Sequence, residues 1–320
     1  MKIQETIENF LSRINLRLME EGERKRFDHL LEEKHYLKST AHPEDTDNVV
    51  GTAGEFGMKS PLGYNEAKPG ETFIKIGVGK LLREDANEYQ FGPPYRVADA
   101  IPWTINRDTR RIRFTQKTPV ANGWGYEYTN RIELARDAPS FTISHTLANT
   151  GDNRILTTYY CHNFVVFDGQ QLSPGARVLL PFATTGDVDL LEVAKVTGRT
   201  LRLDKPLPPD KALWHEFLDF PAGSGKGEYQ LQNPATNSMV TIQPDTVPEK
   251  VTFYAIGKAL CIEAFISIDL APGETKTWSS RYVFESIEGG MRDSCTTLLY
   301  VHTEHPPTPR PPRLSHLALH

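Results

Sequence analysis

The chain has 320 residues, of which 38% are hydrophobic and 24% charged, and its formal net charge is −5. This composition is typical of a soluble globular protein, and the length suffices for one large domain. Lys and Arg are scattered among Asp and Glu without a basic stripe, which argues against nucleic acid as a partner. No apolar run approaches the ~18 residues of a membrane helix, so no membrane partner is expected.

The three cysteines, at positions 161, 261 and 295, lie far apart in the chain. An odd number without close spacing predicts neither a disulfide framework nor a zinc-binding pair. The N-terminal residues lack the continuous apolar stretch of a secretory signal. Together these features predict a cytoplasmic protein.

Residues 1–47 are predicted to form a helical segment followed by a linker. Apolar residues such as Ile3, Ile7 and Leu18 recur with a spacing close to the helical period. The run AHPEDTDN at 41–48 is polar and contains a proline, which is typical of a linker. The chain changes character after this run.

Residues 48–286 are predicted to form one antiparallel all-β domain. Short runs of alternating apolar residues recur there, separated by Gly, Pro, Asn and Asp. The clearest runs are 111–116, 131–134, 141–147, 155–167, 177–182, 227–232, 239–243, 251–256, 260–268 and 276–284. This pattern is typical of a sandwich or a barrel. A doubly wound parallel sheet is disfavoured because no long helical period follows these runs.

Residues 287–320 are predicted to be a disordered tail. The run EHPPTPRPPRLSHLALH is dense in proline and has no periodic apolar pattern. A proline-rich ligand for a partner domain is the functional alternative for this segment.

Sequence motifs exclude several classes of enzyme. The chain has no HExxH, GxSxG or CxxC motif, which leaves zincin, serine-hydrolase and zinc-ribbon interpretations without support. The glycine-rich run GSGKGE at 223–228 lacks the spacing of a phosphate-binding loop and is predicted to be a hairpin turn. No cofactor and no metal are expected from these motifs.

Two polar residues interrupt strongly apolar runs. His162 lies in TTYYCHNFVVFDG, where alternation places it on one face with Tyr160 and Phe164, and places Asn163 on the other face. Glu263 lies in KALCIEAFISIDL, and glutamate is seldom buried unless it is paired. Burial would make such a carboxylate a better base near neutral pH. From the residues alone, a structural histidine and a solvent-facing glutamate remain the alternatives.

Four stretches, in order and separation, resemble the galactose mutarotase-like family, which includes the aldose 1-epimerases and related sugar-phosphate epimerases. They are YNEAKPGETFIKIGVGKL at 64–81, FTISHTLANTGDNRI at 141–155, TTYYCHNFVVFD at 157–168 and LCIEAFISIDLAPGETKTWSSRYVF at 260–284. The resemblance covers residues 51–286, about three quarters of the chain. It implies a large antiparallel β-sandwich with a sugar bound in an open cleft.

The resemblance also implies a reaction, the interconversion of aldose anomers by a sugar epimerase or mutarotase. His162 would be the general acid toward the ring oxygen, and Glu263 would be the general base on the anomeric hydroxyl. The reaction requires no metal or redox cofactor, and the expected partner is a small-molecule sugar or sugar derivative.

Several further residues have the chemistry of a sugar-binding site. Aromatic faces stack on the C–H surfaces of sugars, and planar polar groups bond hydroxyls. The predicted substrate-binding residues are Lys75, Trp124, Arg131, Asn163 and Trp278. His145, on the face of Phe141 and Ile143, is predicted to be structural.

Two alternative functions stay open at the level of sequence. One is a non-catalytic carbohydrate-binding module, which would not need both an acid and a base. The other is an inactive fusion or truncated product, since the resemblance implies strands before GTAGEFG at 51–57 whose place the helical segment takes. The sequence specifies neither the sugar nor the oligomeric state.

Overall fold

The computed structural model describes residues 48–58, 61–91, 95–167, 170–208, 211–217, 220, 223–288 and 297–302. The predicted helical segment and linker at 1–47 lie outside this range, as does most of the predicted tail. Within the described part of the chain, all regular structure is β-strand apart from one 3-10 turn, Pro234–Thr236. The prediction of an all-β fold is therefore confirmed.

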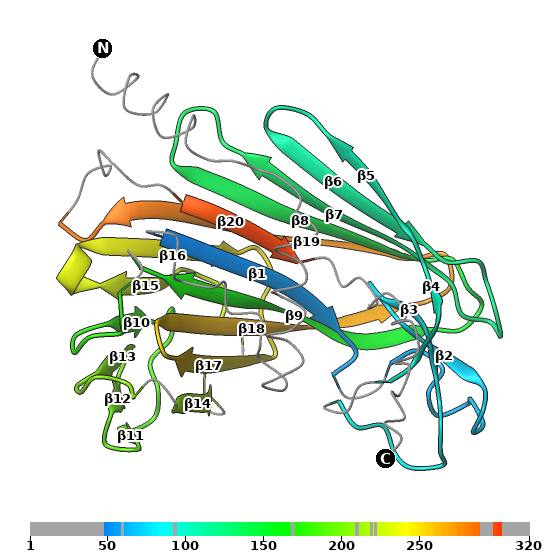
Figure 1. Ribbon diagram of the computed structural model, residues 1–320, viewed down its shortest axis with the longest axis horizontal. Coiled ribbons are helices and arrows are strands. Elements are labelled where there is room, and N and C mark those ends of the chain that lie inside the picture. Colours follow the sequence, from blue (N-terminus) through cyan, green and yellow to red (C-terminus); the bar gives the residue numbers. More distant parts are fainter. Residues whose placement is uncertain are drawn as a thin grey trace, which may run out of the picture.

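Two large sheets and one small sheet make up the fold (Figure 1). The six-stranded sheet has the order β14 (Ala212–Phe217), β17 (Lys250–Ile256), β18 (Ala259–Leu270), β9 (Ile155–Val166), β1 (Asn48–Phe56) and β20 (Thr297–His302). The eleven-stranded sheet has the order β11 (Val188–Leu190), β12 (Ala194–Thr197), β13 (Thr200–Leu203), β10 (Arg177–Leu179), β15 (Tyr229–Asn233), β16 (Ser238–Pro244), β19 (Thr275–Ser286), β8 (Ser140–Asn149), β7 (Tyr126–Leu134), β6 (Arg111–Lys117) and β5 (Trp103–Arg107). The small sheet consists of β2 (Thr72–Lys75), β3 (Gly79–Leu82) and β4 (Val97–Ala100) and lies at one end of the sandwich.

One strand departs from the antiparallel pattern and from the prediction. β20 pairs with β1 in parallel, with Asn48 opposite Thr297 and Ala53 opposite His302. The run TLLYVH is rich in strand-forming residues, and the dense prolines begin only at Pro306. These six residues form a strand where the overall composition of 287–320 predicts a disordered tail.

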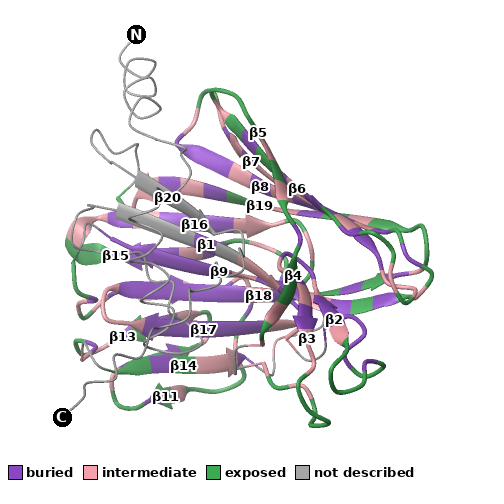
Figure 2. Cartoon of the chain, turned by 45° about the vertical axis from the view of Figure 1, so that its right-hand side comes forward, coloured by how far each residue is buried: buried purple, intermediate pink, exposed green. Residues whose placement is uncertain are grey.

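The two large sheets pack face to face and share one core. Side chains of β9, β14, β17 and β18 meet those of β6, β7, β8, β15, β16 and β19 in this core. We call the face of the six-stranded sheet that points into this core its inner face, and the opposite one its outer face. β9 is buried on both faces for most of its length, as Figure 2 shows along β9, β17 and β18. A polar side chain on the outer face of β9 therefore also needs a partner.

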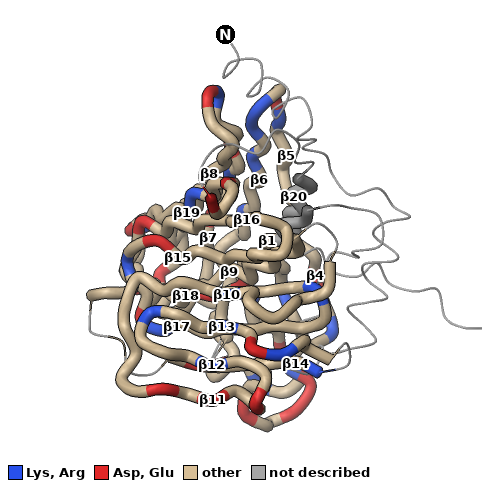
Figure 3. Tube along the Cα trace, turned by 90° about the vertical axis from the view of Figure 1, so that its left-hand side faces the viewer, with Lys and Arg blue, Asp and Glu red and all other residues tan. Residues whose placement is uncertain are grey.

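Charged residues of both signs are interspersed over loops and strand ends, whereas the strands at the centre of the sandwich carry few of them (Figure 3). This distribution agrees with the absence of a basic stripe in the sequence. In the part of the chain that the structure describes, no helix has the length and apolarity to span a membrane.

His145 on β8 is structural, as predicted, and connects the two sheets through the core. Its Nδ1 lies 2.8 Å from the Tyr128 hydroxyl, and its Nε2 lies 3.0 Å from the Tyr159 hydroxyl on β9. Its ring stacks on that of Trp278 with 5.1 Å between the centroids. A neutral imidazole satisfies both hydroxyls, since one nitrogen donates and the other accepts. Burial lowers the pKa of His145 to about 3.

This shift predicts an acid-sensitive core. The unfolded chain binds a proton at His145 below pH 6.5, whereas the folded protein resists protonation until about pH 3. The contribution of His145 to stability is therefore lost as the pH falls between these values. Urea unfolding at pH 7 and at pH 4 should show a smaller acid-induced loss of stability for His145→Gln than for the wild type. Equal losses in both proteins would contradict this assignment.

Candidate functional site

Two adjacent rows of cross-strand neighbours build the candidate site on the outer face of the six-stranded sheet. Between β17 and β18, Thr252 pairs with Glu263 and Lys250 pairs with Phe265. Between β9 and β1, His162 pairs with Ala53 and Tyr160 pairs with Glu55. The register of β18 and β9, with Cys261 opposite Phe164 and Ile266 opposite Tyr159, places Glu263 opposite His162 and Phe265 opposite Tyr160. One row thus carries Thr252, Glu263 and His162, and the next row carries Lys250, Phe265, Tyr160 and Glu55.

His162 lies between two carboxylates. Its Nδ1 is 2.5 Å from Glu263 Oε1, and its Nε2 is 3.5 Å from Glu55 Oε2. His162 and Glu263 are only 6% and 5% exposed. If His162 and Glu263 act together, as the sequence predicts, their side chains must lie on one face of the sheet and close to each other. The structure meets both conditions.

Further hydrogen bonds hold both carboxylates in place. Glu55 accepts from Lys75 Nζ at 2.5 Å and from the Tyr160 hydroxyl at 2.7 Å. Glu263 Oε2 accepts from Thr252 Oγ1 at 2.7 Å. Because buried carboxylates are costly unless they are paired, these bonds account for the burial of both side chains.

The electrostatics of the cluster favour charged forms. Burial alone would lower the pKa of His162, but Glu263 and Glu55 outweigh burial and raise the pKa to about 10. Burial alone would raise the pKa of Glu55, but Lys75 and His162 outweigh it and lower the pKa to about 2. Two carboxylates and two cations thus balance one another in a largely buried cluster.

An open hollow of about 270 Å³ adjoins the second row. It is lined by Met58, Thr158, Glu216, Phe217, Glu249, Lys250 and Phe265. Phe265 stacks on Tyr160 with 4.3 Å between ring centroids, and Tyr160 contacts the His162 ring edge-on. Lys250 Nζ lies 4.3 Å from the Phe265 ring and 3.3 Å from Glu216. An aromatic wall flanked by charges of both signs therefore connects the hollow to His162.

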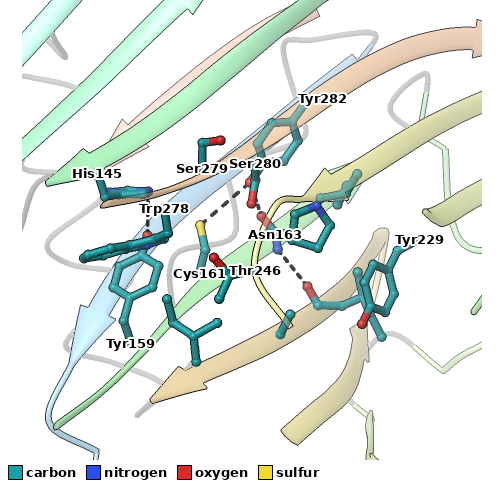
Figure 4. Close-up of a pocket in the computed structure, with 15 residues that line it drawn as sticks. His145, Tyr159, Cys161, Asn163, Tyr229, Thr246, Trp278, Ser279, Ser280 and Tyr282 are labelled. Carbon is teal, nitrogen blue, oxygen red and sulfur yellow. Dashed lines mark hydrogen bonds between the residues drawn. The ribbon is translucent and has the colours of Figure 1, made fainter. Parts of the chain in front are cut away.

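A second, smaller pocket lies on the inner face, between the sheets (Figure 4). Its volume of about 40 Å³ is several-fold smaller than the 270 Å³ of the open hollow and is too small for a sugar. Asn163 donates there to the Ile262 carbonyl at 2.8 Å and accepts from the Tyr282 hydroxyl at 2.6 Å. Trp278 also lines this pocket and is 5% exposed. Both residues belong to the core and lie on the other side of the sheet from His162.

The other two predicted sugar-binding residues also lie apart from the cluster. Arg131 is on β7, on the face of the eleven-stranded sheet that points away from the core, where its nearest acidic neighbour is Glu133 at 3.9 Å. Trp124 closes a tight loop through a bridge to Ala121 and packs against Gly63. Of the five predicted substrate-binding residues, Lys75 alone has its side chain in the cluster, where it bonds Glu55, the carboxylate that faces His162.

Sequence reasoning missed Glu55 and Thr252. Glu55 follows a run of glycine and alanine in GTAGEF, where the pattern of apolar side chains that reveals a buried face is absent. The signal that could have drawn attention to it is a single acidic residue in an otherwise uncharged strand. Its partners come from β2 and β9, which no local pattern connects to β1.

One set of side chains in this cluster has the composition of a metal site. The donor atoms of His162, Cys261 and Glu263 all lie within 4.8 Å of one another, and all three residues are buried. Cys261 Sγ itself lies 3.6 Å from Glu263 Oε1.

Because the charges of the cluster are largely buried, removing the charge of Glu55 should strongly lower the stability of the fold. Glu55→Gln leaves the largely buried Lys75 and His162 short of a carboxylate, so the free energy of unfolding should fall by about 3–5 kcal/mol. Denaturant unfolding at neutral pH measures the change. Replacing Lys75 as well, in Glu55→Gln/Lys75→Met, should restore part of the loss.

The exposed pair Arg154 and Asp269 provides the matched control. Asp269→Asn should cost no more than about 1 kcal/mol, because exposed ion pairs contribute little. Equal costs for Glu55→Gln and Asp269→Asn would show that the buried cluster has no special role in stability.

Comparisons with known proteins find neither a matching family model nor a matching curated protein. Among solved structures, the chain is similar to a candidate aldose 1-epimerase from Escherichia coli K12, with 12% identity, a TM-score of 0.46, and coverage of 74% of this chain and 84% of that one. An aldose epimerase homologue from C. elegans has 13% identity and a TM-score of 0.45, with coverage of 72% of this chain and 82% of that one. A galactose mutarotase-like protein from Clostridium acetobutylicum has 10% identity and a TM-score of 0.44, with coverage of 74% of this chain and 79% of that one. The large antiparallel β-sandwich that the sequence predicts is established by the sheets of this chain itself.

Proposed function

We propose that this chain binds an aldose and interconverts its anomers by acid–base catalysis, with His162 as the acid and Glu263 as the base. The observation that carries the proposal is the 2.5 Å contact between His162 Nδ1 and Glu263 Oε1 on one sheet face, beside an open hollow. A sugar in the hollow would insert its anomeric centre between these two atoms.

The reaction needs such a neighbouring pair because the ring oxygen and the anomeric hydroxyl are bonded to the same carbon. Glu263 takes the proton of the anomeric hydroxyl while His162 delivers a proton to the ring oxygen. The ring C–O bond breaks, its electron pair stays on the ring oxygen, and the anomeric carbon becomes an aldehyde. After rotation of the aldehyde group, both protons return to their donors and the ring closes on the other face.

The hollow supplies the remaining requirements of a sugar site. Phe265 and Thr158 line the hollow and can face C–H and O–H groups of the ring, and Lys250, Glu216 and Glu249 can bond hydroxyls. In this proposal Lys75 is a positioning residue, since its ammonium already bonds Glu55, which faces His162. Cys161 and Cys261 are thiols and are not joined in a disulfide, which supports a reducing, cytoplasmic setting for the reaction.

Anomer exchange measured by NMR on a panel of aldoses tests the proposal. The wild type should exceed the buffer rate, and Glu263→Gln should lower the enzymatic rate by about 10²–10⁴-fold, the usual contribution of a general base. Thermal unfolding of the variant shows whether the fold is kept. Glu133→Gln, on the opposite sheet, serves as the control and should retain the wild-type rate.

Two results would contradict the enzyme proposal. If the wild type exchanges the anomers of every aldose no faster than buffer does, the chain is not a catalyst of this reaction. If calorimetry then shows that Glu263→Gln binds a sugar as tightly as the wild type, the chain is a non-catalytic carbohydrate-binding module. A Glu263→Gln variant that is folded and fully active would remove Glu263 from the mechanism.

A further inference from the structure

We propose that His162 Nδ1, Cys261 Sγ and Glu263 Oε1 form a three-ligand site for a divalent transition-metal ion such as Zn²⁺. This site goes beyond the proposed isomerase function, which needs no metal.

The topology brings the three donors together on one face. Cys261 and Glu263 are two residues apart on β18, so both side chains point outward, and His162 lies opposite Glu263 on β9. Glu263 Oε1 is the shared neighbour, at 2.5 Å from His162 Nδ1 and 3.6 Å from Cys261 Sγ. Donors that converge this closely can bind one ion after small side-chain rotations.

The donor types select the metal. Imidazole nitrogen, thiolate sulfur and carboxylate oxygen are the ligands of zinc in proteins, and three protein ligands leave one of its four positions open. A thiolate in the set favours Zn²⁺ or Co²⁺ over Mg²⁺ or Ca²⁺, which prefer oxygen ligands alone.

Each ligand is held from behind by a second residue. Glu55 lies 3.5 Å from the other ring nitrogen of His162, Thr252 donates to the other oxygen of Glu263 at 2.7 Å, and the backbone N–H of Asn163 donates to Cys261 Sγ at 3.2 Å. Protein metal sites use such outer bonds to orient their ligands, above all a carboxylate behind a histidine. The bond from the Asn163 N–H to Cys261 Sγ is not needed for an ion pair between His162 and Glu263, whereas it would orient a cysteine ligand.

The metal site and the proposed catalytic pair share two atoms, His162 Nδ1 and Glu263 Oε1. A bound ion would occupy the two atoms that transfer protons in the proposed reaction, so the metal would inhibit isomerisation.

Cobalt binding to the full chain, without sugar, tests the site directly. Titration with Co²⁺ should produce the near-ultraviolet charge-transfer absorption of a cobalt–thiolate bond, and Zn²⁺ should displace it. Cys261→Ser should abolish this absorption, while Cys161→Ser, on the inner face of the same sheet, should keep it. Glu55→Gln should weaken Co²⁺ affinity by about 10–100-fold, the usual effect of losing a bond behind a ligand.

The proposal is overturned if the folded wild type shows no cobalt–thiolate absorption. It is also overturned if Cys261→Ser retains that absorption, because another thiol would then be the ligand. Should Cys261→Ser fail to fold, Glu263→Gln and Thr252→Val take its place, and unchanged Co²⁺ affinity in both would equally exclude the site. Since these measurements use no sugar, their failure leaves the proposed isomerase activity unaffected.

Discussion

The structure of the candidate site depends on one constraint, which is that a histidine buried on the outer face of β9 lies between two carboxylates. At this depth both carboxylates, Glu263 and Glu55, need cations in contact. His162 and Lys75 supply those cations, at 2.5 Å from Glu263 and from Glu55 respectively. β1, β2, β9 and β18 must therefore keep one mutual arrangement, and that arrangement creates the site.

The two sides of β9 show how hydrogen-bonding partners can give two equally buried histidines opposite properties. His145 contacts β9 on the inner side through the Tyr159 hydroxyl, has only neutral partners within hydrogen-bond reach, and has a pKa lowered to about 3. His162 on the outer side has carboxylate partners and a pKa raised to about 10. Both are almost fully buried, so the difference comes from the partners. The inner histidine stabilises the sandwich, and the outer one is available for chemistry.

Most of the fold and part of the site could be predicted from sequence. Strands such as β8 and β18 alternate apolar and polar residues, and the same alternation placed His162 and Glu263 on defined faces. The sequence predicts Trp278 at the sugar site, but its alternation with Tyr282 in TWSSRYVF places it on the buried face of β19, away from His162. Glu55 could not be paired with His162, because their contact depends on the register of strands more than 100 residues apart.

A crystal structure of the full chain with a bound aldose tests the central claim most directly, since it locates the sugar. The sugar should lie on the outer face of the six-stranded sheet, over β9 and β18, with its ring in the hollow beside Phe265. Its ring oxygen and anomeric hydroxyl should separate His162 Nδ1 from Glu263 Oε1, which are in contact without it. A sugar bound elsewhere on the sandwich, with the contact between His162 and Glu263 intact, would contradict this assignment of the site.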